Sequence, residues 1–192
     1  KLSIDNEADS LTLLNVIAQK KKYPKLKVLV SLGGWGGCKT CSDAFSTKKG
    51  RTDFAISTAN IIESYQADGI DLDWEYPGIS GFPGHKYQPG DRENFTELVL
   101  ELRKHMNKGD ILSFAAGANA NDYFEKSIEW NKVMPLVDNV NLMTYDFYGS
   151  GSSKTGHHTP LGSDNFKEGS VVSSIKTLTK LGVKPEFFVR NP

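Results

Sequence analysis

The sequence lacks several features that mark whole classes of protein. Its 192 residues include no apolar run close to the roughly 18 residues that span a bilayer, so we expect no membrane segment. Lys plus Arg and Asp plus Glu both number 23, so no net charge favours nucleic acid or an anionic surface as a partner. Neither a G-x-G-x-x-G nor a G-x-x-x-x-G-K-S/T loop is present, which argues against nucleotide binding.

Cysteine is also scarce, because only Cys38 and Cys41 occur, in the spacing C-x-x-C. A structural zinc site needs two more ligands, and the sequence has no second cysteine pair. His157 and His158 lie far along the chain and next to each other, which is poor ligand geometry. We therefore expect neither a metal nor another cofactor, and the two cysteines form either ordinary thiols or a small local disulfide.

The stretch from Asp68 to Pro77 has the pattern of a β-strand with acid groups on one side. Side chains on a strand point alternately to its two faces. One face carries Asp71, Asp73 and Glu75, and the other carries Ile70, Leu72, Trp74 and Tyr76. Burying each unpaired charge costs several kcal/mol, so the carboxylates are expected to line a polar interior or a cleft.

The position of Glu75 within this stretch predicts its chemistry. Pro77 cannot donate a backbone hydrogen bond, so we expect the strand to stop just after Glu75. Crowded carboxylates share protons, which raises the pKa of one of them. A carboxylic acid that keeps its proton near neutral pH is suited to act as a general acid.

Helix and strand patterns alternate along the rest of the chain, which favours a parallel sheet. The residues that look functional follow the carboxyl ends of strands, where barrels and doubly wound sheets both place their sites. Inward-facing polar residues favour the barrel. The expected elements are helices from Ser10 (as cap) to about Lys22, from about Arg51 to Ala67, from Asp91 (as cap) to Gly109, around Lys126 to Leu136 and from Ser170 to Leu181, and further strands at Lys27–Leu32, Ile111–Ala116 and Asn139–Asp146, with another opening at Phe187.

Two long loops and one tryptophan follow these strands. Residues 77–90 contain four glycines and three prolines, a composition that forms neither helix nor strand. Phe82 and Tyr87 in this loop either contact a substrate or pin the loop. Trp35 lies at the carboxyl edge of a strand, and its position alone fits either a core aromatic or an exposed one. Residues 147–168 form the second loop, which is polar and rich in Gly and Ser.

Three ordered motifs make the sequence resemble the family 18 glycoside hydrolases, and specifically the bacterial-type chitinases. Asp68, Asp71, Asp73 and Glu75 fit the D-x-x-D-x-D-x-E signature within a full D-G-x-D-x-D-W-E-Y-P form. Residues 31–35 match the S-x-G-G-W strand of that family, and residues 143–146 match its M-x-Y-D strand. The similarity extends over essentially the whole chain.

This resemblance implies a (β/α)8 TIM barrel with the three motifs on its third, fourth and sixth strands. The chain then covers only about the third to the start of the seventh strand. Its length of 192 residues is below the roughly 250 typical of this fold. We therefore expect residues 1–192 to be a single, partial catalytic domain, with the first two strands before Lys1 and the eighth after Pro192.

The resemblance also implies a chitinase that hydrolyses β-1,4 linkages between N-acetylglucosamine units with retention and substrate assistance. Glu75 would be the general acid, and Asp73 would orient the substrate's acetamido group. Asp71 would support Asp73 by sharing a proton with it, and Tyr145 would hold the acetamido oxygen. The residues expected to bind the sugars of chitin or its oligosaccharides are Gly34, Trp35, Tyr76, Met143 and Asp146.

The sequence is compatible with three other interpretations. An endo-β-N-acetylglucosaminidase that acts on N-glycans would use the same chemistry. A chitin-binding relative without catalysis usually lacks the acid at the position of Glu75, which is present here. A fragment without the missing strands would be inactive. By resemblance we expect a secreted protein, and we expect a monomer.

Overall fold

The centre of the molecule is a four-stranded parallel sheet in the order β1-β2-β3-β4. The computed structural model describes residues 1–118, 123–162, 169–184 and 186. The strands are β1 Leu29–Gly33, β2 Gly69–Asp73, β3 Ile111–Gly117 and β4 Asn139–Met143. Parallel pairing of every neighbouring pair confirms the predicted sheet. The strand expected to open at Phe187 lies outside the described residues.

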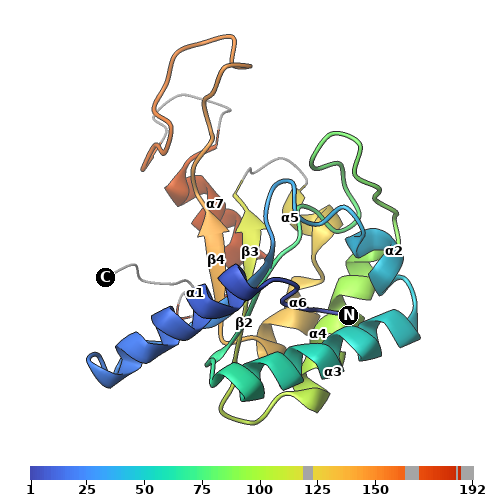
Figure 1. Ribbon diagram of the computed structural model, residues 1–192. Coiled ribbons are helices and arrows are strands. Elements are labelled where there is room, and N and C mark those ends of the chain that lie inside the picture. Colours follow the sequence, from blue (N-terminus) through green and yellow to red (C-terminus); the bar gives the residue numbers. More distant parts are fainter. Residues whose placement is uncertain (119–122, 163–168, 185, 187–192) are drawn as a thin grey trace.

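Helices connect successive strands and pack on the face of the sheet that carries Ile70, Leu72 and Phe114 (Figure 1). A row of aromatic rings runs through this core: Phe45, Trp74, Phe95, Phe114 and Trp130, with neighbouring ring centroids 5.4, 6.3, 5.4 and 5.7 Å apart. The helical elements are α1 Glu7–Ala18, η1 Gln19–Lys21, α2 Cys41–Phe45, α3 Lys48–Tyr65, α4 Asp91–His105, α5 Tyr123–Ser127, α6 Trp130–Val133, η2 Met134–Leu136 and α7 Val171–Lys180.

The opposite face of the sheet is polar. The strand register places Ser31 of β1 beside Asp71 of β2, and Asp71 beside Ser113 of β3. Ala115 of β3 is in turn paired with Asn141 of β4. In an α/β barrel the helices form the outer ring, so the polar face of this sheet, which lies opposite the helices, corresponds to the inner side of a barrel wall.

Several helices begin at other residues than the sequence predicted. Helix α1 is capped by Asn6, whose Oδ1 accepts from the backbone N–H of Asp9 at 2.8 Å, and not by Ser10. The Ser10 hydroxyl instead lies 2.8 Å from the Tyr65 hydroxyl, which is a long-range contact. Asp91 is the first residue of α4 and not its cap, because Gly90 occupies the cap position. Local pattern identified these helices but not their caps.

Other elements end earlier or break. The helix predicted around residues 126–136 is divided into α5, α6 and η2, because Trp130 turns into the core against Phe114. Strand β2 ends at Asp73, so Glu75 lies beyond the strand and not on it. Strand β4 ends at Met143, and the Thr144 N–H bonds back to the Leu142 carbonyl at 2.9 Å.

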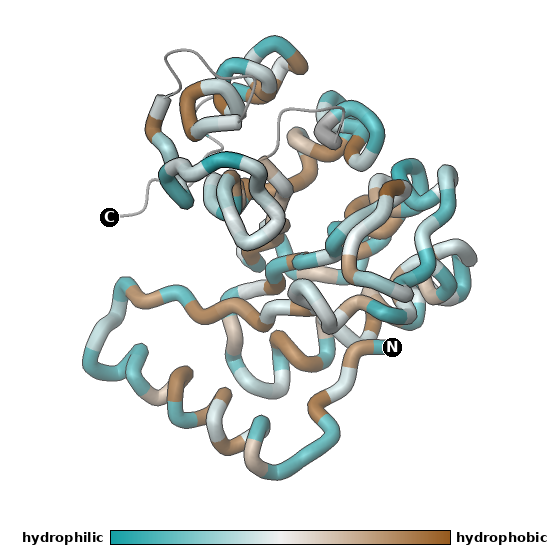
Figure 2. The backbone as a smooth tube through the Cα atoms, turned by 90° about the horizontal axis from the view of Figure 1, so that it is seen from above, coloured by the Kyte–Doolittle hydropathy of each residue, from teal (hydrophilic) through white to brown (hydrophobic). Residues whose placement is uncertain are grey.

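Helix α1 projects from the body of the molecule (Figures 1 and 2). None of its residues is buried, and Leu11, Leu14 and Val16 are exposed apolar side chains. Figure 2 shows apolar residues spaced along this helix. In the described part of the chain, every helix is too short or too polar to cross a membrane.

Candidate functional site

Asp71 lies at the centre of the polar face, where side chains from the three other strands surround it. Its Oδ1 accepts hydrogen bonds from Ser113 Oγ at 2.6 Å and from Asn141 Nδ2 at 2.8 Å. Ser31 Oγ lies 3.4 Å from its Oδ2. Donors on the other strands of the sheet therefore fix this carboxylate and help to offset its charge.

Asp73 is the next residue on the same face, one step closer to the carboxyl end of β2. Burial raises the pKa of its carboxyl group, and the negative charge of Asp71 raises it further. Its Oδ1 is buried and has no hydrogen-bond partner among the described residues. A Cβ added to Gly34 would lie 3.9 Å from Asp73 Oδ2, so Gly34 borders this carboxylate.

Glu75 follows the end of β2 and is 9% exposed. Burial is the main reason that its pKa is raised. The charges of Asp73 and Asp146 raise this pKa further, while a hydrogen bond with Tyr76 acts in the opposite direction. The loop of residues 77–90 folds back over it, since a Cβ on Gly81 would lie only 2.0 Å from the Glu75 carbonyl oxygen. A raised pKa lets this carboxyl group keep its proton to a higher pH than an ordinary glutamate, which suits a general acid.

The chain beyond β4 brings a phenol and another carboxylate to these acids. The pKa of Tyr145 is raised by burial and by the nearby charges of Asp73, Glu75 and Asp146. Its hydroxyl therefore keeps its proton and remains a hydrogen-bond donor. Asp146 has a positive φ of 57°, and the chain turns away at this residue.

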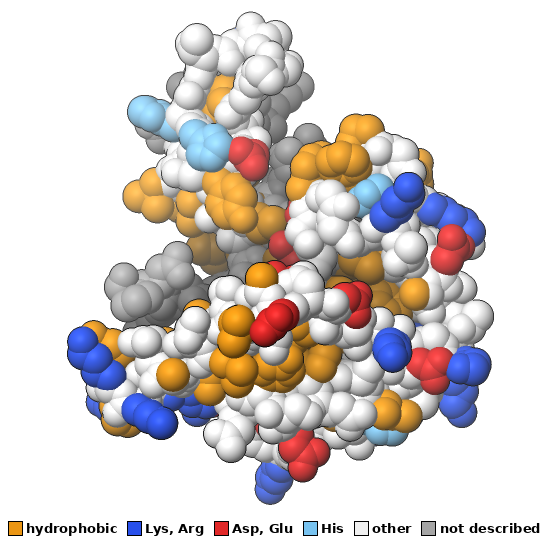
Figure 3. Space-filling view, viewed as in Figure 1, with side chains coloured by type: hydrophobic (Ala, Val, Ile, Leu, Met, Phe, Trp, Pro, Cys, Tyr) orange, Lys and Arg blue, Asp and Glu red, His pale blue; other side chains and the backbone are white. Residues whose placement is uncertain are grey.

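One cleft of about 650 Å³ collects these side chains. It contains seven of the nine residues predicted for the site: Trp35, Asp73, Glu75, Tyr76, Met143, Tyr145 and Asp146. Asp71 lies in an adjoining cavity of about 430 Å³ that it shares with Asp73, Met143 and Tyr145, and Gly34 borders Asp73. Figure 3 shows a hollow with hydrophobic and acidic side chains on its walls.

Tyr76 departs from the predicted strand alternation. Ile70, Leu72 and Trp74 are buried in the core as expected, but Tyr76 lines the cleft on the opposite side. The reason is that β2 ends at Asp73, so the alternation of a strand no longer applies at Tyr76. The Glu75–Tyr76 peptide bond is cis. The Tyr76 ring lies against Gly117, where an added Cβ would be 3.2 Å from it.

Trp35 forms one wall of the cleft and is not part of the core, since 52% of it is exposed. Its ring meets Tyr76 edge-on at 6.5 Å and Phe82 edge-on at 5.8 Å between centroids. Phe82 therefore pins its loop against the wall. The two alternatives that the sequence left for Trp35 are resolved in favour of the exposed position.

Sequence reasoning missed two kinds of residue at the site. It considered His158 only as a zinc ligand, whereas its ring stacks on Tyr145 and its Nε2 lies 3.3 Å from Asp146 Oδ1. Ser113 was also missed, although a buried serine in an apolar strand is a signal of an inward polar partner. In the part of the chain that the structure describes, no group of three or more His, Cys, Asp or Glu could hold a metal ion.

Comparison with known proteins gives consistent matches. The model of the glycosyl hydrolases family 18 matches residues 1–189. Chitinase A1 of Niallia circulans is 35% identical over 164 residues, which are 82% of this chain and 23% of that protein. The chain spans well under half the length of the curated relatives it matches, with shares of 23%, 34% and 35% for three of them.

Solved structures agree with this result. Chitinase ChiW from Paenibacillus sp. str. FPU-7 matches with a TM-score of 0.89 and 39% identity, over 96% of this chain and 17% of that one. The Ostrinia furnacalis Group IV chitinase in complex with allosamidin matches with a TM-score of 0.87 and 31% identity, over 98% of this chain and 52% of that one. These likenesses confirm the predicted TIM-barrel fold, of which β1 to β4 are consecutive strands.

Proposed function

This chain belongs to glycosyl hydrolase family 18, and we propose that it is the central part of a chitinase domain that hydrolyses β-1,4 linkages between N-acetylglucosamine units. Family 18 enzymes differ from most glycosidases because the substrate itself supplies the nucleophile. The observation that carries the proposal is one cleft in which two carboxyl groups with raised pKa values, Asp73 and Glu75, face the phenol of Tyr145.

Glu75 is the proposed general acid. It donates its proton to the glycosidic oxygen as the bond from this oxygen to the anomeric carbon breaks. The acetamido carbonyl oxygen of the same sugar forms a bond to that carbon, which gives a cyclic oxazolinium ion. Water then attacks the anomeric carbon, the bond from this carbon to the acetamido oxygen breaks, and the water gives a proton to the Glu75 carboxylate. The acetamido group and the acid are restored, and the configuration is retained.

Asp73 is the proposed partner of the acetamido nitrogen. Its buried Oδ1 has no hydrogen-bond partner among the described residues, and a buried acceptor of this kind is stabilised when a ligand brings a donor. An N–H donated to this oxygen would orient the acetamido group and offset the charge that develops on it. Asp71 is proposed to support Asp73 from beneath, fixed by Ser113 and Asn141.

Tyr145 is proposed to donate to the acetamido oxygen from the other side of the cleft. The remaining predicted residues would bind the sugar rings. Trp35 and Tyr76 offer aromatic faces and edges to the apolar faces of a β-linked sugar chain, whereas Met143 at the end of β4 and Asp146 beyond it complete the wall. Gly34 would let the sugar approach Asp73.

We also expect the whole protein to be secreted. Chitin is insoluble and extracellular, and the Cys38–Cys41 disulfide of this structure is typical of proteins that fold in an oxidising compartment. The same site chemistry would suit an endo-β-N-acetylglucosaminidase, so the assay that follows includes both substrate classes.

The test replaces the acid without changing its shape, in a protein that contains the whole barrel. Glu75→Gln is expected to lower turnover of chitin oligosaccharides about 100-fold or more while their binding is unchanged, because only the proton is lost. Glu97→Gln, at an exposed position on α4, is the matched control and is expected to leave both turnover and binding unchanged. Turnover of Glu75→Gln near the normal rate would remove Glu75 from the acid role. Cleavage of an N-glycan core but not of chitin oligosaccharides would favour the glucosaminidase.

A further inference from the structure

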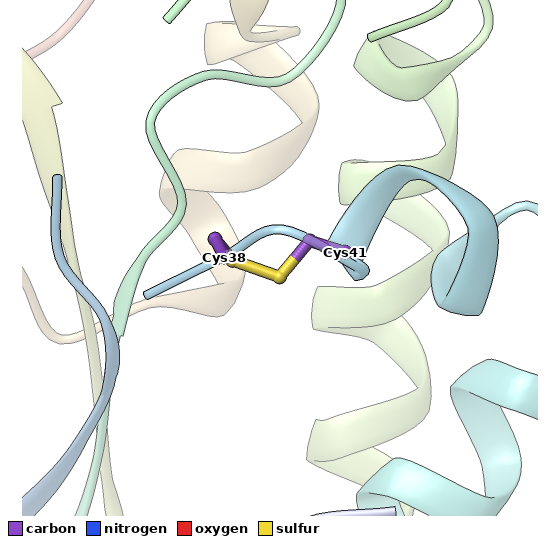
Figure 4. Close-up of a disulfide and its surroundings, with 2 residues drawn as sticks. All are labelled: Cys38 and Cys41. Atoms are coloured by element: carbon purple, nitrogen blue, oxygen red, sulfur yellow. A yellow bond between two sulfur atoms is a disulfide. The ribbon is translucent and has the colours of Figure 1, made fainter. Parts of the chain in front are cut away.

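The loop that carries Trp35 is closed by a disulfide at its far end (Figure 4). Cys38 and Cys41 are both buried, and the Cys41 N–H bonds to the Cys38 carbonyl at 3.1 Å. Between Trp35 and the disulfide the backbone is tightly packed, because a Cβ on Gly37 would lie 2.0 Å from the Gly33 carbonyl oxygen. The Trp35 loop, residues 34–41, is therefore fixed at both ends, by β1 and by the disulfide.

A buried polar cluster joins the far end of the Trp35 loop, next to Cys41, to the loop of residues 77–90. Ser42 follows Cys41, and its hydroxyl donates to Asp91 Oδ1 at 3.0 Å. The other Asp91 oxygen accepts from the Gln88 backbone N–H at 2.7 Å, and Gln88 Nε2 donates to Ser42 Oγ at 2.8 Å. Ser42 and Asp91 are both fully buried, so their bonds are protected from competing water.

The same two loops also meet at the mouth of the cleft. Phe82 contacts the edge of Trp35 at 5.8 Å, and a Cβ on Gly36 would lie 3.6 Å from the Phe82 ring. The His85 ring also packs against Phe82, with ring centroids 4.8 Å apart. Trp35 is thus half exposed to solvent and yet held in place, because the two loops are joined both at the buried polar cluster and at Phe82.

We propose that the Cys38–Cys41 disulfide, the Ser42–Gln88–Asp91 cluster and Phe82 are positioning residues for Trp35. They hold its ring at the angle that a sugar chain meets in the cleft. They set affinity for the sugar bound at this end, and they take no part in bond cleavage at Glu75. The statement about sugars rests on the proposed function, but the placement of Trp35 does not.

The first arm of the test needs no substrate. Trp74 and Trp130 are each 4% exposed, whereas Trp35 is 52% exposed, so the emission lost in Trp35→Phe reports the exposed ring. We expect Cys38→Ala/Cys41→Ala to lower the fluorescence anisotropy of this component and to increase its quenching by acrylamide. Unchanged anisotropy and quenching would overturn the proposal, whether or not the protein cleaves chitin.

The second arm measures, with chitohexaose as substrate in the whole-barrel protein, whether the effect of the disulfide on KM depends on Trp35. We expect Cys38→Ala/Cys41→Ala to raise KM about fivefold, the size of one aromatic contact, with kcat within about twofold of normal. The same change in a Trp35→Ala background is expected to raise KM no further, because the group being positioned is gone. An equal rise in both backgrounds would contradict the proposal, since the disulfide would then act elsewhere.

Two further variants separate positioning from stability. Phe82→Leu keeps the disulfide, so it tests the proposal even if the cysteine variant does not fold. We expect it to raise KM when Trp35 is present and to leave KM unchanged in the Trp35→Ala background. Val133→Ala, at a fully buried site on α6, is expected to lower the melting temperature without a change in KM. A KM increase in Val133→Ala equal to that in the positioning variants would show that general destabilisation explains the effect, and would overturn the proposal.

Discussion

Replacement of Asp73 by Asn is expected to make the protein more stable at neutral pH. Burial and the charge of Asp71 raise the pKa of Asp73 above its ordinary value of 3.8. The folded state therefore holds this proton more tightly than the unfolded state. Stability then falls as pH rises from 3.8 through the raised pKa, and the full penalty is present above it. Asn carries no such penalty.

The size of the effect follows from the strand geometry. Asp71 and Asp73 are two residues apart on one face of β2, so their side chains start roughly 6.6 Å apart. Two unit charges at this distance repel by about 2.5 kcal/mol at an effective dielectric constant of about 20. Because Asp73 is only half-buried and solvent screens part of this repulsion, we expect a gain of about 1 kcal/mol for Asp73→Asn at pH 7.

Denaturant unfolding at several pH values from 3 to 8 measures this difference. The free energy of unfolding of Asp73→Asn should match that of the unchanged protein below pH 3.8, and exceed it as the pH rises. Glu97→Gln, at an exposed site on α4, is the control and should show no such trend. A constant difference across the pH range, or a less stable Asp73→Asn at pH 7, would refute the electrostatic argument.

Two other predictions concern turnover. Tyr145→Phe removes one hydroxyl from a half-exposed ring, so it should lower kcat about 10- to 100-fold with the melting temperature unchanged; a normal kcat would exclude the acetamido contact. The raised pKa of Glu75 predicts that kcat falls as pH rises through that pKa, because the acid must be protonated; a kcat that rises with pH over this window in a pH–rate profile would contradict the assignment.

The acidic strand was the part of the site that the sequence predicted best. Strand alternation correctly placed Asp71 and Asp73 on one face and Ile70 and Leu72 on the other. It failed for Tyr76, because periodicity holds only while the chain stays in the sheet, and β2 ends at Asp73. The end of a strand depends on its neighbours, which a single sequence does not reveal.

Long-range contacts explain most of the remaining differences. The sequence did not predict α2, a helix of five residues that starts at Cys41 beside the disulfide and the buried pair of Ser42 and Asp91. Likewise, nothing local indicates that the loop of residues 147–162 returns His158 to the ring of Tyr145. Both features arise from residues that are distant in sequence and meet only in the fold.

A thiazoline analogue of the proposed oxazolinium ion tests the central claim most directly. The claim is that the acetamido group of the substrate is the nucleophile and that Asp73 and Tyr145 hold it. Calorimetry should give a Kd for the thiazoline about 100-fold or more below that of the parent disaccharide, and Asp73→Ala should remove most of this advantage. Equal affinity for the thiazoline and the disaccharide would contradict the account.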